Sequence, residues 1–153
     1  MGNNRRVTFL QFAPLIKPSE LRPPPFTYDM SVMAPTPITL HDKFAQFHDL
    51  WTPRIIGELN DQHIKIAKVD GEFIWHHHAQ EDELFMVVQG KLLMDFRDHT
   101  EEVHPGQLLV VPRGVEHRPR TEAETWILMI EPKITLNTGA VESERTRRDL
   151  KVL

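Results

Sequence analysis

The stretch GEFIWHHHAQEDELFMVVQG, residues 71–90, decides the fold and the candidate site of this chain. It holds three consecutive histidines in a run of strand-forming residues between two glycines. Side chains alternate between the two faces of a strand, so we expect His76 and His78 on one face and His77 on the other. Neutral imidazole is a common ligand of first-row metals. The pair His76 and His78 is half of a metal site, although such a pair is as typical of a solvated strand.

Two further residues extend the pair. Glu83 follows a four-residue turn and begins the next predicted strand, where a carboxylate oxygen can join two imidazole nitrogens. A second stretch, GQLLVVPRGVEH at residues 106–117, ends in His117 just after a Pro-Arg-Gly turn. His117 is the natural candidate for the fourth ligand. His77 faces away, and we interpret it as a packed or interface histidine.

Composition excludes several classes of protein. The chain has 153 residues, with 40% hydrophobic and 26% charged residues, which is typical of one globular domain. A net charge of -4 gives no basic surplus for nucleic acid. With no cysteine, disulfides, thiolate ligands and a cysteine nucleophile are excluded. The first residues lack the pattern of a signal peptide, and no stretch reaches the length of a membrane span, so we expect a cytoplasmic protein.

Three regions follow from the pattern along the chain. Residues 1–50 hold seven of the 12 prolines and predict an extended Pro-rich arm, with a short helix or turn near residues 41–51. Residues 51–132 predict a β-barrel or sandwich, since short alternating segments are separated by Gly and Pro turns. Residues 133–153 predict a polar C-terminal tail or a short surface helix. The predicted strands are 55–59, 63–69, 72–78, 83–88, 91–97, 107–111, 116–120 and 125–131.

The spacing His76-x-His78-x4-Glu83-x6-Gly90 resembles the first motif of the cupin superfamily, in its small single-domain, cupin 2 type. The segment Gly106-x5-Pro112-x-Gly114-x2-His117 resembles the second motif. The likeness covers residues 55–132 and departs from the family at two positions. Thr121 stands where the second motif often has Asn, and Gly71 lies five residues before His76 where the family often has six.

The resemblance implies an all-β fold, a double-stranded β-helix or jelly-roll barrel. It also implies one divalent metal ion, iron, manganese, zinc or nickel, held inside the barrel by His76, His78, Glu83 and His117. Three nitrogens and one oxygen do not choose among these metals. Coordination positions left open by the protein would admit water and a small-molecule ligand.

Strand parity also predicts the pocket and a partner. Ile74, Phe85 and Val87 share the face of the metal ligands and are candidates to line a pocket. A single sheet does not usually expose an apolar row on its second face, so either sheet-on-sheet contact or a dimer interface covers that row, and we expect a homodimer. The row comprises Phe73, Trp75, Leu84, Met86 and Val88. Arg118 and Arg120 are interpreted as surface charges, with binding of a carboxylate at the barrel mouth as the alternative.

Three functions are compatible with these residues. The first is an enzyme, a metal-dependent oxygenase or isomerase acting on a small polar molecule. The second is a binding or sensing module without turnover, which fits the lack of an evident general base outside the four ligands. The third is a metal that only braces the barrel. The sequence leaves the catalytic residues unassigned.

Overall fold

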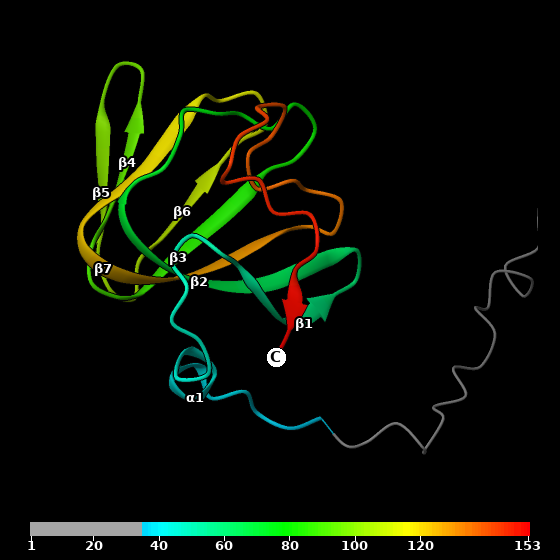
Figure 1. Cartoon of the computed structure of the whole chain (residues 1–153). Coiled ribbons are helices and arrows are strands. Elements are labelled where there is room, and N and C mark those ends of the chain that lie inside the picture. Colours follow the sequence, from blue (N-terminus) through cyan, green and yellow to red (C-terminus); the bar gives the residue numbers. More distant parts are fainter. Residues whose placement is uncertain (1–34) are drawn as a thin grey trace, which may run out of the picture. The chain divides into compact units, whose positions relative to one another are not determined.

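The computed structural model describes residues 35–153, and residues 1–34 of the arm predicted at residues 1–50 lie outside that part. Residues Pro37–Leu153 form one compact unit (Figure 1). It contains one short helix, α1, and eight strands, so the all-β prediction is confirmed. The elements are α1 (Leu40–Phe44), β1 (Arg54–Leu59), β2 (Gln62–Glu72), β3 (Glu83–Gln89), β4 (Leu92–Phe96), β5 (Thr100–Val103), β6 (Leu108–Val111), β7 (His117–Pro132) and β8 (Lys151–Val152).

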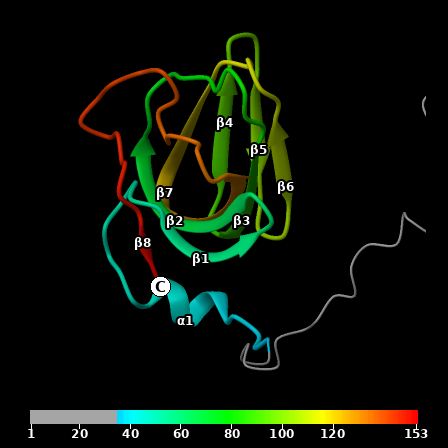
Figure 2. The same cartoon turned by 90° about the vertical axis from the view of Figure 1, so that its right-hand side faces the viewer.

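Strand β7 organises the barrel. It is 16 residues long and pairs with β2 along one edge from Arg120 to Pro132. Its other edge pairs first with β4 and then with β3, whereas β6 pairs only with β3. One strand thus joins both halves of the sheet, which curves into a barrel (Figures 1 and 2). Because β7 passes from one half to the other, its first residue and the start of β3 can meet inside.

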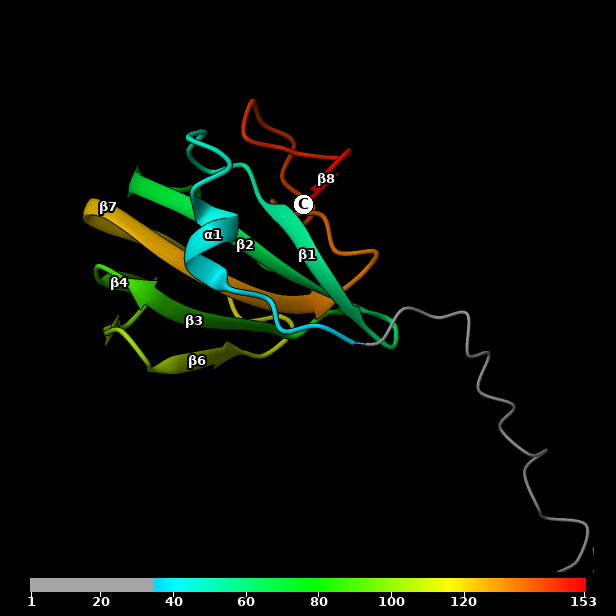
Figure 3. The same cartoon turned by 90° about the horizontal axis from the view of Figure 1, so that it is seen from below.

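Two apolar clusters stabilise this arrangement. The larger one fills the barrel, where Phe85, Val87, Leu92, Met94 and Ile127 are buried among other apolar side chains. The alternating burial of β3 follows from strand pleating, since every second residue faces the interior. The smaller cluster lies on the outer face of β2 and β7, under α1. Figure 3 shows α1 across these strands.

The C-terminal segment packs against the barrel. The sequence predicted a solvated tail or a surface helix at residues 133–153, but the segment contains no helix and ends in β8, which pairs in parallel with β1. The amide of Leu153 donates to the carbonyl of Ile55 at 2.9 Å, and Thr138 is fully buried. The many charged residues of this segment led to the prediction of a solvated tail. The contacts that hold it were not evident from the sequence, because they are made by backbone groups and small hydroxyl side chains.

Several predicted strands differ from the observed ones. The strand predicted at residues 72–78 is wrong, because β2 ends at Glu72 and only His76 continues the pairing, as an isolated bridge to His117. The predicted strands 116–120 and 125–131 are one strand, β7. Strands β5 and β8 were missed. In the described part of the chain no helix is long and apolar enough to cross a membrane.

Candidate metal centre

Four side chains converge inside the barrel. One potential ligand atom from each of His76, His78, Glu83 and His117 lies within 4.8 Å of the others. Glu83 opens β3 and His117 opens β7, while the two other histidines lie in the connection between β2 and β3. All four are buried, with at most 4% of any residue exposed. The sequence predicted this set, and the fold brings its members together.

Backbone pairing aligns two of these residues. The amide of His76 donates to the carbonyl of His117 at 3.0 Å, and the amide of His117 donates back at 2.9 Å. Directly opposed residues of an antiparallel pair project to the same face, so both rings enter the barrel, 4.3 Å apart at their centroids.

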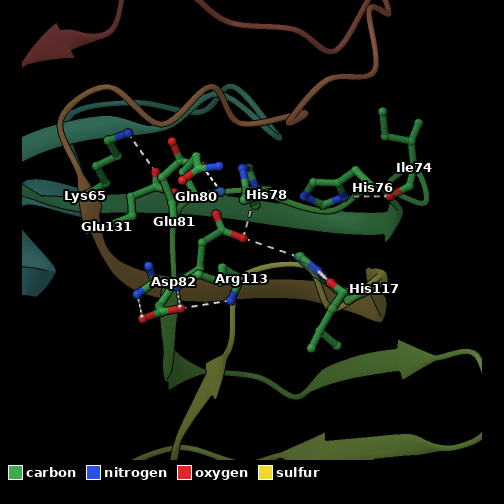
Figure 4. Close-up of polar contacts among 12 residues, drawn as sticks. Lys65, Ile74, His76, His78, Gln80, Glu81, Asp82, Arg113, His117 and Glu131 are labelled. Atoms are coloured by element: carbon green, nitrogen blue, oxygen red, sulfur yellow. Dashed lines mark hydrogen bonds and ion pairs between the residues drawn. The ribbon is translucent and has the colours of Figure 1, made fainter.

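A loop contact holds the third histidine. The amide of Gly114 donates to the carbonyl of His78 at 2.7 Å. Arg113 beside it forms a two-pronged ion pair with Asp82, with its closest nitrogen–oxygen distances at 3.0 and 3.1 Å (Figure 4). The Pro-Arg-Gly turn of the second motif is therefore fastened to the loop that leads into β3.

Hydrogen bonds fix the tautomers of two rings. The Nδ1 atoms of His76 and His117 each lie 3.0 Å from a carbonyl oxygen two residues earlier, at Ile74 and Val115. A carbonyl oxygen only accepts, so Nδ1 carries the proton and Nε2 keeps its lone pair. Partners of this kind orient the histidine ligands of metal sites.

The ligand atoms themselves lack partners. Oε2 of Glu83 lies 3.0 Å from Nε2 of His78 and 3.2 Å from Nε2 of His117. All three atoms are buried without a hydrogen bond of acceptable geometry. Buried polar atoms are rarely left in this state, and a divalent cation between them would satisfy all three. The residues present therefore fit a metal ion.

Electrostatics keep the cluster in a metal-binding form. The pKa of His76 is lowered to about 4, mainly by burial and to a smaller extent by the nearby His117. Its ring is therefore neutral at physiological pH. Burial alone would raise the pKa of Glu83. The imidazoles of His117 and His78 outweigh this effect and lower that pKa well below its ordinary value. A neutral ring and a carboxylate anion are the forms that bind metal.

The residues around the histidines follow strand parity only in part. His77 faces away from the cluster, as predicted, but it is exposed and not packed against other residues of the described part of the chain. Phe73 was expected on the outer face but is buried in the interior, where its ring contacts His76 edge-on at 5.3 Å between centroids. Phe73 keeps the inward parity of Ala67 and Val69 on β2, whose side chains belong to the same interior cluster. The alternation breaks after Phe73, because β2 ends at Glu72 and His76 pairs only as an isolated bridge.

A cavity of about 40 Å³ lies beside the cluster. Of the three predicted pocket residues, Phe85 lines this cavity, whereas Val87 is buried elsewhere in the core and Ile74 packs against that core. Its apolar wall includes Trp51, Phe73, Phe85, Ile127 and Met129. Its polar wall is formed by His76, Glu83, Glu131 and Asn137. An apolar cavity with a few convergent polar groups is typical of a small-molecule site.

Glu131 and Lys65 were missed by the sequence reasoning. They form a buried ion pair between β7 and β2, with 2.6 Å between Nζ and Oε1 (Figure 4). The pKa of Glu131 is raised well above its ordinary value, mainly by burial and next by the nearby Glu83 carboxylate. Lys65 has the opposite effect but does not outweigh them. The available signal was parity, since Glu131 continues the inward row of Ile127 and Met129.

Arg118 and Arg120 take the surface role that the sequence favoured. Both donate to Oδ2 of Asp95 at 2.8 Å, and Arg118 also donates to Glu72 at 2.8 Å. These two guanidinium groups join β7 to β4 and β2. Their charges are matched by carboxylates of the protein itself.

Comparison with known proteins agrees with the fold and the cluster. The family model for the cupin domain matches residues 63–131. A crystal structure of a cupin-2 domain containing protein from Shewanella frigidimarina NCIMB 400 is 46% identical, with a TM-score of 0.62. The match covers 63% of this chain and 94% of that one.

Two curated proteins are also similar. The uncharacterized protein YdbB of Bacillus subtilis is 42% identical over 79 residues, which cover 51% of this chain and 70% of that protein. An acireductone dioxygenase of Puccinia graminis f. sp. tritici is 31% identical over 104 residues, which cover 61% of this chain and 54% of that protein. The chain thus spans about half the length of the dioxygenase.

Proposed function

This chain belongs to the cupin family, and from that premise we propose that it is a metal-dependent oxygenase of a small polar molecule. The metal is one divalent ion, bound by His76, His78, Glu83 and His117. The observation that carries the proposal is that three ligand atoms, on His78, Glu83 and His117, are buried without a hydrogen-bond partner. Backbone hydrogen bonds fix the tautomer of His117 and the position of His78. Oxygenation is favoured over isomerisation because one similar protein is named a dioxygenase.

The surroundings of the cluster support turnover rather than bracing alone. A metal that only braced the barrel would require no adjoining space, yet a cavity of about 40 Å³ borders His76 and Glu83. A bound metal would supply Lewis acidity and, if redox-active, a site for dioxygen chemistry.

The chain's own residues would bind and orient the substrate. The aromatic wall of Trp51, Phe73 and Phe85 packs against its apolar part and excludes water. Glu131 lies in the same wall, interacts with Glu83 and is not itself a proposed ligand. It is the candidate to hold or move a proton, a role for which the sequence showed no residue.

Metal content is the first test. Protein purified without an affinity tag should contain about one equivalent of a divalent metal by elemental analysis. The variants His76→Ala and His117→Ala should lose it, and His77→Ala, an exposed neighbour, should keep it. A full equivalent in both ligand variants would refute the site.

Oxygen uptake is the second test. The metal-loaded protein should consume dioxygen with members of a panel of small carbonyl, enediol and catechol compounds, and treatment with a chelator should abolish this. Metal retention with no uptake, and with no ligand-induced rise in melting temperature, would support a bracing metal. Ligand binding without uptake would support a sensing module.

A further inference from the structure

Arg145 lies against the aromatic wall of the cavity. Its Cζ atom is 5.5 Å from the ring centroid of Trp51 and 5.8 Å from that of Phe73. Both rings line the cavity, and they stack on each other with centroids 5.0 Å apart. A guanidinium over such rings gains a cation–π attraction, which fixes its position while leaving its N–H groups available.

The guanidinium of Arg145 has no hydrogen-bond or ion-pair partner among residues 35–153. Arg147, two residues later, donates through Nη1 to the carbonyls of Glu144 and Thr146. Every other arginine in that range pairs with a carboxylate of the protein: Arg54, Arg97, Arg113, Arg118, Arg120 and Arg148. A planar donor group with no protein acceptor, next to a cavity, is suited to a ligand's acceptor.

The backbone around Arg145 is held in place. Nδ2 of Asn137, a residue of the cavity wall, donates to the carbonyl of Arg145 at 2.8 Å. Its Oδ1 accepts from the amide of Arg147 at 2.8 Å. The hydroxyl groups of Thr138 and Thr146 are hydrogen-bonded at 2.9 Å. The charged C-terminal segment is thus anchored to the cavity rather than free in solvent.

One ring connects Arg145 to the metal centre. Phe73 lies under the guanidinium and also contacts the ring of His76, 5.3 Å away at the centroids. A ligand that extends past Phe73 would reach both groups. The carboxylate of Glu83 lines the cavity and disfavours an acidic group beside it. An acidic group of a ligand is consequently favoured at the Arg145 end.

We propose that Arg145 binds the carboxylate of a small organic acid whose other oxygen atoms reach the metal centre. This inference rests on the proposed function, and it narrows the substrate class to a carboxylic acid with a short apolar body. A carboxylate is favoured over a phosphate because one guanidinium matches one negative charge and a planar, two-oxygen acceptor.

The test compares an acid with its uncharged ester. The probes are 5-oxohexanoate, its methyl ester and inorganic phosphate, titrated calorimetrically into metal-loaded full-length protein. The variant Arg145→Met keeps the length and apolar stem of the side chain. Arg148→Gln is the matched control, because it removes the same charge from an exposed position on the same segment. Metal content and melting temperature are recorded for each protein.

The acid should bind wild-type protein at least tenfold more tightly than its ester or phosphate. Arg145→Met should weaken the acid by about tenfold to a hundredfold, leaving ester binding and metal content unchanged. Arg148→Gln should bind the acid as wild type does. Equal affinities for acid and ester, tighter binding of phosphate, or wild-type acid binding by Arg145→Met would overturn the inference. If the protein held no metal but still bound the acid in a way that depends on Arg145, only the proposed metal centre would be overturned.

Discussion

At the scale of single residues, two backbone carbonyls determine what the histidine cluster can bind. The carbonyls of Ile74 and Val115 each hold the Nδ1 proton of a ring two residues later. The Nε2 lone pairs of His76 and His117 therefore point at the centre before any metal arrives. This preorganisation lowers the cost of binding, because neither ring has to change its tautomer or its rotamer.

The buried pair of Lys65 and Glu131 gives the first prediction. Lys65→Met should lower the free energy of unfolding by about 3 kcal/mol, because it leaves Glu131 buried beside Glu83 without its cation. The double change Lys65→Met with Glu131→Leu should recover part of this loss. Urea unfolding of the metal-free proteins measures both.

The control for this pair is Lys133→Met. Lys133 also pairs with a glutamate, Glu58, but on the surface, so its loss should cost well under about 1 kcal/mol. Equal losses for the buried and the surface lysine would contradict the argument.

The residues of the metal cluster could be predicted from the sequence, whereas most residues of the cavity wall could not. His76, His78 and Glu83 are close in the chain, so strand parity and a short turn were enough to bring them together. Trp51 and Asn137 come from segments outside the recognised motifs. Their positions depend on long-range packing, which local alternation does not encode.

At the scale of elements, β4 and β7 are joined by ion pairs between Asp95 and two arginines as well as by backbone pairing. Burial would raise the pKa of Asp95, but hydrogen bonds from Arg120, Thr100 and Arg118 lower it to about 2. A carboxyl group with a lowered pKa stabilises the folded state fully above its unfolded pKa of about 4. That contribution is lost as the pH falls from about 4 through about 2.

Asp95→Asn tests this connection. The substitution should cost about 2 kcal/mol at neutral pH and flatten the decline of stability between about pH 4 and about pH 2. Unfolding by urea at a series of pH values measures both effects. Asp82→Asn is the control, since Asp82 pairs with Arg113 in the exposed loop. An unchanged acid slope in Asp95→Asn would show that Asp95 is not the group responsible.

Gly90, in the turn between β3 and β4, is required both for its positive φ and for a close contact with β7, whereas Gly106, in the turn before β6, is required only for its positive φ. Gly90 has a φ of 86°, and a Cβ atom there would lie 2.9 Å from Cα of Thr125 on β7. Gly106 has a φ of 83°, but a Cβ atom added there would meet nothing within 4 Å. Gly90→Ala should therefore cost about 3 kcal/mol and Gly106→Ala about 1 kcal/mol. Similar costs in thermal or urea unfolding would exclude the close contact as a cause.

Element prediction succeeded where alternation was regular and failed where the backbone deviates. Strands β1, β3, β4 and β6 lie within one residue of their predicted ends. The segment after β2 carries strand-like residues, but beyond Phe73 only His76 pairs with β7, as an isolated bridge to His117. Strand β5 is rich in charge, so its sequence TEEV has no apolar alternation to detect.

At the scale of the whole molecule, the three outer strand edges of the described sheet are unequal. Strand β5 presents Glu101 and Glu102, and β8 is two residues long with Lys151. Strand β6 carries only apolar residues, LLVV, and pairs on one side with β3 (Figure 3). Charged or short edges resist pairing with a second chain, whereas β6 has neither protection.

The outer face of β3 and β6 is the surface on which we expect the homodimer. Leu84 lies opposite Val110 and Met86 opposite Leu108, so the four side chains form one patch. Leu108 is 58% exposed and Val110 49% exposed. Of the apolar row predicted from the sequence, Leu84 and Met86 remain on this face, while Phe73 has moved inside.

The dimer prediction is tested by mass in solution. Light scattering on the full-length chain should give twice 17.8 kDa. The double variant Leu108→Glu with Val110→Lys should give the monomer mass while keeping its metal, because the patch lies outside the barrel. Ile134→Lys is the control, since Ile134 is more exposed, at 84%, but lies away from any strand edge. A monomeric wild type would overturn the dimer prediction, and a dimeric double variant would show that another surface forms the dimer, because the two charges would disrupt pairing at an apolar edge.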